Sequence, residues 1–531
     1  MGERTVATTW RLREDYWETF EVTDEDVEFL YQHLLEEERP LSPEVLVEAL
    51  VAERLRRERE ALEQRRAGDR LIYLPKEHYE VGAQLIFPAL DWAAGEVVAV
   101  RPGRNPELGD FEVIRVRFAD GREREFAAGL AEHPLNEPPK MDDQGPLSGP
   151  QQVLEQYRKS LVARLEEALG QHEDFVRIAG RWFPRALVME VNIGHLNLAE
   201  AVLDVAGGGP LPTRAIMEQI EFPTTDNPHL AEFSFDLALQ EDERFDEVGP
   251  AGQVLWFLKR LEPEWVLETP PFLQYEPLDY DRAALTRDML ALEVDLADEL
   301  SPVGEDAPEQ DAVEITLIYP HWRAGTLPLA AKVRHLFPTA YEAPRIRFIL
   351  VDGETGEEFV GWVVREARYV YGLRPWYEAK GLLPGSVIRV RQGPEPGKVI
   401  VEPTSQRTVR EWVRTVFVGS DDRIGLRLLQ QRVNAGFDER MLFYVPDVEA
   451  MDRAWQQTQR ERVPLEKLLV RMMRELMQAT SQPHVHAAEL YAALNLVRRC
   501  PPGPILALLA SRPWFDHVGD LYYRLRESDL A

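Results

Sequence analysis

Two distant stretches of this chain share one spacing of residues, and this recurrence constrains the fold more than any other feature. Residues 244–258 read RFDEVGPAGQVLWFL, and residues 513–525 read PWFDHVGDLYYRL. Each has a Phe (Phe245, Phe515), a Val three positions later, a Gly next to it, and then an apolar run rich in aromatic residues. A Gly between two apolar runs is typical of the turn of a two-stranded hairpin. The sequence therefore predicts the same small unit twice.

The similarity extends upstream of both hairpins with identical offsets. The apolar positions, five and then four residues apart, are Leu211, Ile216 and Ile220 in one stretch and Val485, Leu490 and Leu494 in the other. Further helices are predicted on both sides of these positions. The expected inward stripes of the last helices are Leu230, Phe233 and Leu237 in the first stretch and Ile505, Leu508 and Leu509 in the second.

Three helices followed by a two-stranded wing is the plan of the winged helix-turn-helix fold. A third, partial copy is predicted at 151–188, where Phe175 and Ile178 keep the three-residue spacing, Gly180 makes the turn and Trp182 takes the aromatic place. Its first two helices are interpreted as the pair before Arg66, with a separate domain inserted between the second and third helices. Thr23 is the expected cap of the first of these helices, and Ser42-Pro43 opens the second.

These units resemble the HARE-type winged helix domain, the fold of the folded region of the bacterial RNA polymerase delta subunit. The resemblance rests on the last helix, the Phe-x-x-(Val/Ile) spacing, the Gly and the aromatic residue. It implies an adaptor for nucleic acid or for polymerase rather than a catalyst. DNA and RNA polymerase, or another transcription protein, are therefore the partners expected from it.

The charges of the copies differ, and this difference predicts where nucleic acid would bind. The copy at 197–263 surrounds Arg244 with five acidic residues, which would repel a phosphate backbone. The partial copy carries a cluster of cations as candidate nucleic-acid contacts: Arg158, Lys159, Arg164, Arg177, Arg181 and Arg185. Ion pairs with Glu166, Glu167 and Glu173 are an equally good interpretation of these cations.

Residues 71–130 have the texture of a small β-barrel, with short apolar runs separated by Gly, Pro and Asp-Gly turns. Ile114, Val116 and Phe118 alternate with Val113, Arg115 and Arg117, which predicts one apolar and one basic face. This stretch resembles the SH3-like or KOW-like barrels of transcription and translation proteins.

Residues 312–420 are again strand-like and contain LLPGSVIRVRQ after a pair of strands joined at Asp352-Gly353. They resemble the DNA-binding pseudobarrel of plant transcription factors and certain restriction endonucleases. From position 311 to 415 there are 15 Lys and Arg against 12 Asp and Glu, in a chain with a net charge of −31. The candidate nucleic-acid contacts here are Arg345, Arg347, Arg365, Arg368, Arg374, Arg389 and Arg391. The aromatic residues among them (Trp362, Tyr369, Tyr371, Trp376 and Tyr377) are expected to serve the core more often than a ligand.

At 531 residues the chain is long enough for about three to five domains. The predicted order is a helical segment (1–70), the small barrel (71–130), a winged helix region (150–265), an acidic linker (266–311), the pseudobarrel (312–420), a connecting segment (421–459) and a C-terminal winged helix (460–531). The fold class is thus α+β, with several domains. A single cysteine, the lack of an apolar leader and the lack of a long apolar run favour a reducing, cytoplasmic location.

Catalytic signatures are not recognisable in the sequence. It lacks a phosphate loop, a nucleophile elbow, a zinc-protease helix and a dinucleotide turn. The pair His484 and His486 is expected to cap or line a helix, and neither a cofactor nor a metal is predicted. The leading hypothesis is a non-enzymatic adaptor that acts on DNA or on the transcription machinery. The alternatives are a DNA-recognition component of a restriction or defence system and an acidic protein-binding scaffold.

Overall fold

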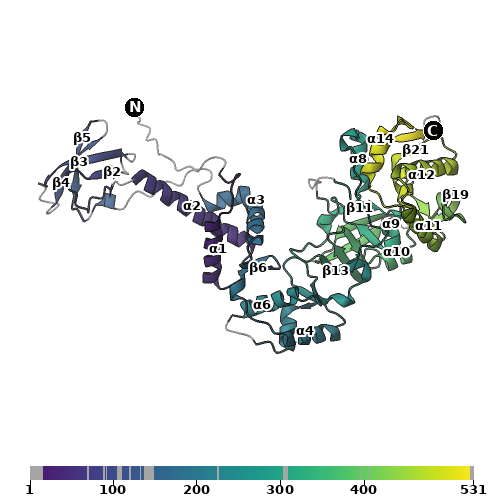
Figure 1. The fold of residues 1–531 in the computed structure, drawn as a ribbon, viewed down its shortest axis with the longest axis horizontal. Helices are drawn as coiled ribbons and strands as arrows, with labels where there is room; N and C mark the ends of the chain where they lie inside the picture. Colours follow the sequence, from purple (N-terminus) through teal and green to yellow (C-terminus); the bar gives the residue numbers. More distant parts are fainter. Residues whose placement is uncertain are drawn as a thin grey trace. The chain divides into compact units, whose positions relative to one another are not determined.

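The structure is a computed structural model, and its chain divides into two compact units, Met1–Val188 and Met189–Ala531 (Figure 1). It describes residues 16–526, apart from 68–70, 88–89, 91–92, 105–110, 119–120, 132, 137–148, 224–226, 303–308, 396 and 406. The described part is a mixture of α-helices and of several separate β-sheets, as predicted. No helix in these ranges is both long and apolar enough to span a membrane.

The first unit contains a helical bundle, here called the first bundle. Its elements are α1 (Asp24–Glu37), α2 (Pro43–Ala67), α3 (Pro150–Gly170), β6 (Phe175–Ile178) and β7 (Arg181–Pro184). The carboxylate of Asp26 accepts hydrogen bonds of 2.9 Å from the backbone N–H and the hydroxyl of Thr23, which fixes the start of α1. Pro43 is the first residue of α2, where its missing N–H costs nothing. The β6–β7 hairpin turns at Ala179 and Gly180, both with positive φ, as a two-residue turn requires.

One core joins the two helices before position 68 to the helix after position 149. Leu41 pairs with Trp182 of β7 through backbone hydrogen bonds of 3.1 and 2.8 Å, so a third strand residue lies beside the hairpin. Leu41, Leu46 and Leu50 are buried in the same cluster as Leu165 and Phe175. These three leucines stand five and then four residues apart, the offsets found in the other two stretches.

The stretch between α2 and α3 forms a sheet of its own. Its five strands, in order, are β1 (Leu71–Ile72), β2 (Gln84–Phe87), β3 (Ala93–Pro102), β4 (Glu112–Phe118) and β5 (Glu123–Ala128). Ile114 and Val116 are fully buried, whereas Arg115 and Arg117 are exposed and form ion pairs with Glu125 and Glu123. The predicted alternation along β4 is confirmed, but its basic face is neutralised by the neighbouring strand.

The second unit begins with the second bundle. Its elements are α4 (Ile193–Val205), β8 (Leu211–Pro212), α5 (Thr213–Gln219), α6 (Pro228–Glu241), β9 (Phe245–Glu247) and β10 (Leu255–Leu258). The strands form a sheet in the order β8-β10-β9. Trp256 and Phe245 are buried at its centre. A buried network ties the elements together, because the carboxylate of Asp236 accepts from the Thr213 hydroxyl at 2.5 Å and from the Trp256 indole N–H at 2.9 Å.

The same element order closes the chain in the third bundle. It consists of α12 (Leu465–Thr480), β21 (Val485–His486), α13 (Ala487–Leu494), α14 (Pro502–Ser511), β22 (Phe515–Gly519) and β23 (Tyr522–Leu525). Its strand order β21-β23-β22 matches that of the second bundle, and Phe515 and Tyr523 are buried. Helix, short strand, two helices and hairpin therefore occur three times in the described residues.

The predicted inward stripe of α6 is wrong. Phe233 and Leu237 are buried, but the core of the second bundle takes Ala231, Phe235 and Leu239 instead. The reason is that α6 is apolar around most of its circumference, so periodicity does not show which side faces the bundle. In α14, Ile505 and Leu509 do lie in the core, and Leu508 packs at its edge.

A seven-stranded sheet lies between the second and third bundles in sequence. Its order is β11-β16-β17-β13-β14-β15-β12. The strands are β11 (Ala312–Thr316), β12 (Thr326–Pro328), β13 (Arg345–Asp352), β14 (Glu358–Val364), β15 (Tyr369–Tyr371), β16 (Val387–Gln392) and β17 (Lys398–Pro403). Helices α9 (Tyr319–Ala324) and α10 (Arg374–Lys380) interrupt them. The sheet ends at Pro403, so the predicted range 312–420 extends into a different sheet.

The predicted connecting segment 421–459 is structured. β18 (Val409–Val418) and β19 (Ile424–Val433) form a long antiparallel ribbon, and β20 (Phe443–Tyr444) pairs with β18 in parallel. Helix α11 (Val448–Glu461) follows and contributes Met451 and Trp455 to the large core around the third bundle. This ribbon is an element that the sequence interpretation did not include.

The predicted acidic linker 266–311 also has more structure than a linker. It contains α8 (Arg287–Leu296), preceded by the short helix α7 (Glu264–Leu267). The side chains of Asp298 and Glu299 are buried, and both form ion pairs with the buried Arg499 of the third bundle at 2.7 Å. The acidic composition predicts a solvent-exposed linker. These two carboxylates are buried instead, because Arg499, 200 residues from Glu299 in the sequence, neutralises them.

Candidate nucleic-acid interface

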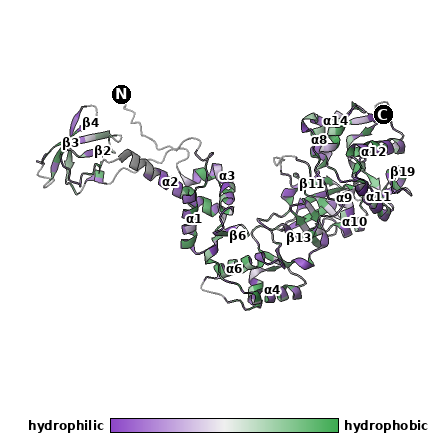
Figure 2. Ribbon diagram, in the orientation of Figure 1, coloured by the Kyte–Doolittle hydropathy of each residue, from purple (hydrophilic) through white to green (hydrophobic). Residues whose placement is uncertain are grey.

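Helix α3 is the third helix of the first bundle, and one of its sides is open. Val153, Leu161, Leu165 and Leu169 are buried in the core. The opposite side exposes Gln152, Gln156, Lys159 and Ala163, which are spaced four, three and four residues apart and thus form one stripe. Hydrophilic and hydrophobic residues both occur along α3 in Figure 2. The stripe carries two amides and a cation, the groups that contact base edges and phosphates.

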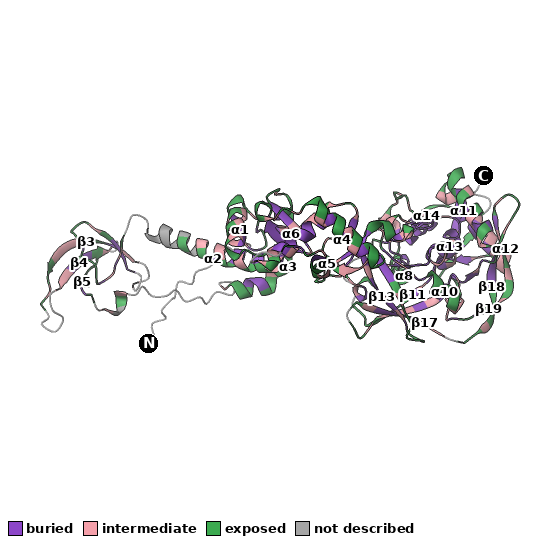
Figure 3. Cartoon of the chain, turned by 90° about the horizontal axis from the view of Figure 1, so that it is seen from below, coloured by how far each residue is buried: buried purple, intermediate pink, exposed green. Residues whose placement is uncertain are grey.

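The third helices of the other two bundles offer no such side. Every residue from 233 to 237 in α6 and from 502 to 507 in α14 is buried. Most residues of α14 are buried, whereas α3 has exposed residues along its length (Figure 3). A helix that is covered on all sides cannot enter a groove of DNA. This difference in burial separates the first bundle from the other two.

The cations predicted in the first bundle fall into two groups. Arg158 forms an ion pair with Glu48 at 3.2 Å, and Arg177 forms one with Glu166 at 2.8 Å and lies over the Trp182 ring. Arg185 is exposed but also has an interaction within the chain. The side chains of Lys159 and Arg181, by contrast, are exposed and have neither an ion pair nor a hydrogen bond within the described residues. They are the two predicted cations of this bundle that are available to an external anion.

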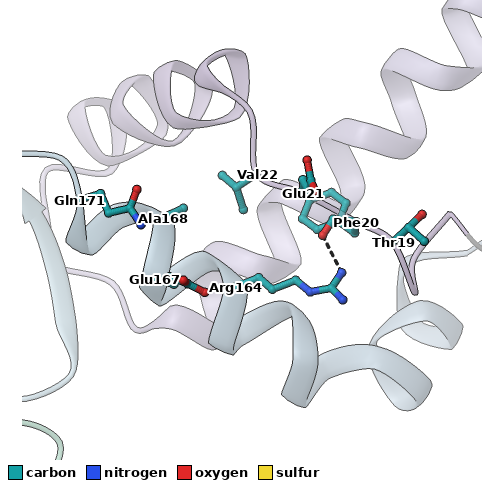
Figure 4. A pocket seen from close by; sticks show the side chains of 8 residues that line it. All are labelled: Thr19, Phe20, Glu21, Val22, Arg164, Glu167, Ala168 and Gln171. Atoms are coloured by element: carbon teal, nitrogen blue, oxygen red, sulfur yellow. Dashed lines mark hydrogen bonds between the residues drawn. The ribbon is translucent and has the colours of Figure 1, made fainter.

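Arg164 has a structural role in a pocket of about 510 Å³ between α3 and the segment before α1. The pocket is lined by Thr19, Phe20, Glu21, Val22, Arg164, Glu167, Ala168 and Gln171. The Arg164 guanidinium donates to the carbonyl of Phe20 at 2.6 Å (Figure 4). It also donates to the carbonyl of Glu18 at 2.7 Å. Because these carbonyls occupy its donors, the guanidinium fastens residues 18–20 to α3, and the pocket has no free cation among its residues.

The second bundle is strongly acidic. Between 193 and 258 it holds 12 Asp and Glu against two Arg. Arg244 is fully engaged, with ion pairs of 2.7 Å to both Asp242 and Glu200, and Arg214 forms an ion pair with Glu232 at 3.0 Å. The two arginines of this bundle are thus both engaged with carboxylates of the same bundle.

Two of the cations predicted on the seven-stranded sheet are covered by the second bundle. Arg345 forms ion pairs with Asp246 of β9 and with Glu262. Arg347 is half-buried, its guanidinium lies over the Phe257 ring, and its backbone N–H donates to Val248 at 2.9 Å. Both predicted nucleic-acid contacts are therefore engaged within the second unit, where this end of the sheet packs on the β9–β10 hairpin.

Most of the remaining arginines of this domain have partners as well. Arg389 forms ion pairs with Glu314 and Glu402, and Arg374 forms one with Glu378. Arg365 donates to the carbonyls of Tyr341 and Ala343, and Arg368 to that of Glu299. Arg391 alone of the seven has neither an ion pair nor a side-chain hydrogen bond or ring contact to another described residue. Among the seven arginines predicted here, one cation is thus left without a partner in the described residues.

The aromatic residues in the same range serve the interior. Trp362, Tyr369, Trp376 and Tyr377 are buried, and Trp362 contacts the Phe257 ring at 5.5 Å between centroids. Tyr371 is partly buried against the same cluster. The expectation that these rings pack in the core is confirmed.

Two carboxyl groups on either side of this contact, Glu247 and Glu262, have raised pKa values. Burial, together with the charges of Glu342, Asp236 and Asp246, raises the pKa of Glu247 to about 8. Burial and the neighbouring Asp246 likewise raise the pKa of Glu262 to about 8. Their neighbours Glu342 and Arg345 belong to the domain of the seven-stranded sheet, so the protonation of both groups affects the contact between the second bundle and that domain.

Groups for nucleophilic or metal chemistry are not assembled in the described ranges. No set of three or more His, Cys, Asp or Glu side chains there is placed to hold a metal ion. Cys500 is buried, and this burial raises the pKa of its thiol to about 12, so the thiolate is scarce at neutral pH. His486 accepts from the backbone N–H of Ala488 at 3.1 Å and caps α13, and burial lowers its pKa to about 4.

The sequence interpretation missed one exposed aromatic residue. Trp412 on β18 is 61% exposed, with exposed Arg410 beside it on the same strand. The signal was present as alternation around the turn 419–423, between VREWVRTVFV and IGLRLLQQRV. A Trp at a polar position of such a ribbon indicates a surface role, because cores take their aromatic residues from the apolar positions.

Neither a protein-family model nor a curated protein nor a solved structure matches this chain. Conclusions about function therefore rest on its own residues.

Proposed function

We propose that this protein is a nucleic-acid-binding adaptor whose three bundles are winged helix units and whose first bundle contacts DNA. The observation that carries the proposal is the open stripe of α3, with Gln152, Gln156 and Lys159, followed by the unpaired Arg181 in the hairpin. In winged helix proteins the third helix enters the major groove and the hairpin lies along the backbone. The first bundle has both contacts available.

The chemistry of the stripe suits duplex DNA. A glutamine amide donates and accepts at once, as the N6 and N7 positions of adenine require, and a lysine can contact guanine or a phosphate. Arg181 follows the turn at Ala179 and Gly180, so it stands at the tip of the hairpin, where it would contact phosphate. Because few cations are available, binding depends on the stripe of α3 and on Arg181 of the hairpin together.

The second and third bundles take supporting roles in this proposal. Their third helices are covered, and the second bundle is strongly acidic. The resemblance to the RNA polymerase delta subunit supports a non-enzymatic role beside the transcription machinery in the cytoplasm. The five-stranded sheet would be an SH3-like barrel, and the seven-stranded sheet a pseudobarrel that holds the second and third bundles.

Fluorescence anisotropy of the full chain with a labelled duplex over a salt series tests the proposal. The wild-type chain should bind at low salt, with log affinity falling linearly with log salt. Lys159→Ala together with Arg181→Ala should reduce the slope by about 2, since each phosphate contact contributes about 0.9. Arg214→Ala, an exposed but paired arginine of the second bundle, is the matched control and should leave the slope unchanged. Equal slopes for the wild-type chain and the double variant would refute the proposal.

A second candidate function is a protein contact through the acidic surface of the second bundle. The bundle holds 12 acidic residues and only two arginines, which favours this function because a basic protein patch would find few competing cations there. Glu218→Lys with Glu243→Lys reverses two exposed charges of this bundle. The pair should weaken binding of purified RNA polymerase in a salt-dependent way. Lys159→Ala with Arg181→Ala should not, and unchanged binding by the first pair would exclude this contact.

A further inference from the structure

The β18–β19 ribbon buries a different face at each of its ends. At the turn end, Val416 of β18 and Ile424 and Leu426 of β19 enter the core of the third bundle. At the other end the opposite face is buried, where Val413 and Val433 pack with Leu442. Side chains alternate between the two faces along a strand. The face that enters the core of the third bundle at the turn end is therefore uncovered at the other end, where Val413 and Val433 bury the opposite face.

The uncovered face holds four side chains, here called the ribbon patch. They are Arg410 and Trp412 on β18, with Arg432 and Gln430 directly opposite them on β19. All four are exposed. The next residue on this face, Arg414, is buried and forms an ion pair with Glu489 at 2.5 Å, so it closes the patch at one end.

Arg410 and Arg432 are cross-strand neighbours of like charge. Directly opposed side chains in an antiparallel pair lie about 5 Å apart at their Cβ atoms, and like charges there destabilise the pair. Neither of these two arginines has an ion pair or a side-chain hydrogen bond within the described residues. Two unneutralised cations at this spacing constitute a site for an anionic group.

The Trp412 ring is also free on its surface. No described aromatic ring or guanidinium stacks on it. Phe417, the other exposed aromatic of the ribbon, differs because the guanidinium of Arg427 lies over its ring at 5.3 Å. A flat, exposed ring beside a pair of cations is an arrangement on which an unpaired base stacks while its phosphates contact arginine.

We propose that the ribbon patch binds single-stranded nucleic acid, with one base stacked on Trp412 and the adjoining phosphates held by Arg410 and Arg432. Gln430 faces the ring from the opposite strand and hydrogen-bonds the edge of the base. A duplex does not fit this site, because its bases are stacked on one another. The proposal rests on the proposed function for its class of ligand and adds a second site, specific for a single strand, in the other unit of the chain.

The test is fluorescence anisotropy of the full chain with labelled oligothymidylate of about 12 nucleotides, a length within the usual range for single-strand sites. Trp412→Ala should weaken binding by about 10-fold or more, as loss of one stacked base does. Arg410→Ala with Arg432→Ala should lower the salt slope by about 1.4, since each phosphate contributes about 0.7 on a single strand. Phe417→Ala is the matched control and should bind like the wild-type chain. Unchanged binding by Trp412→Ala would overturn the proposal.

Two further arms separate this site from the first bundle and from a general anion site. Lys159→Ala with Arg181→Ala should weaken duplex binding and leave the effect of Trp412→Ala on oligothymidylate intact. Loss of oligothymidylate binding alone, with duplex binding retained, is expected for Trp412→Ala. Polyglutamate should not compete; competition as strong as that of unlabelled oligothymidylate would overturn the stacked-base proposal. Failure of the wild-type chain to bind the oligonucleotide at low salt would overturn it too, whereas the duplex series tests the first bundle separately.

Discussion

The guanidinium of Arg499 donates to the carboxylate of Asp298 at 2.7 and 2.8 Å, and both side chains are fully buried. Glu299 accepts from the same guanidinium at 2.7 Å and contacts His321 at 3.0 Å. The carboxylates follow α8, whereas Arg499 lies in the third bundle and His321 lies in α9, between β11 and β12 of the seven-stranded sheet. This network joins three parts of the second unit that composition alone would place in separate domains.

Arg499→Ala is expected to destabilise the second unit by about 3–5 kcal/mol, because it leaves two buried carboxylates without a cation. The neighbouring Arg498→Ala is the control. Arg498 is part-exposed and donates to the carbonyl of Val463, so its loss should cost about 1 kcal/mol. Urea unfolding of the full chain measures both. Equal midpoints for the two variants would contradict a structural role of the network.

The second unit should lose stability as the pH rises through about 8. The folded pKa of Glu247 is raised, so the native state binds this proton more tightly than the unfolded state does. The contribution is complete below the unfolded pKa of about 4.5 and is lost as the pH passes the folded value. We expect a decrease of roughly 1–3 kcal/mol between pH 5 and 9. Glu247→Gln should flatten this dependence, whereas Glu243→Gln, at an exposed position, should not. Thermal unfolding across this range measures it, and a steeper decline in Glu247→Gln would contradict the assignment.

The first bundle should survive removal of the five-stranded sheet. Leu41, Leu46 and Leu50 share one core with Leu165 on the far side of the inserted sheet. The variant replaces residues 60–148 with a Gly-Ser linker of about 15 residues, which spans about 20 Å. We expect α3 to stay protected from hydrogen exchange in this variant. Removal of residues 171–188, which include Phe175 and Trp182, should abolish that protection. Equal loss in both variants would show that the sheet is required for the bundle.

The recurrence of the bundles could be predicted from the sequence because local spacing specifies it. Phe245 and Phe515 start equivalent hairpins, and the apolar offsets upstream place equivalent strands and helices. In the first bundle the same offsets at Leu41, Leu46 and Leu50 were less visible, since about 80 residues separate its second and third helices.

The binding residues were less predictable, because a cation's partner often lies far away in the sequence. Arg345 is neutralised by Asp246, 99 residues earlier, and Arg389 by Glu314, 75 residues earlier. A local count of charges includes such arginines as free. The exposure of the third helices was equally hard to predict. The apolar patterns of α6 and α14 predict third helices like α3, and only the packing of the second unit shows that these two helices are covered.

Site-specific photo-crosslinking shows which bundle contacts DNA. A benzophenone amino acid at position 156, on the open stripe of α3, is compared with the same group at position 229, an exposed position near the start of α6. We expect the full chain to crosslink to duplex DNA from position 156 and not from position 229. Crosslinking from position 229 with none from position 156 would contradict the assignment of the DNA contact to the first bundle.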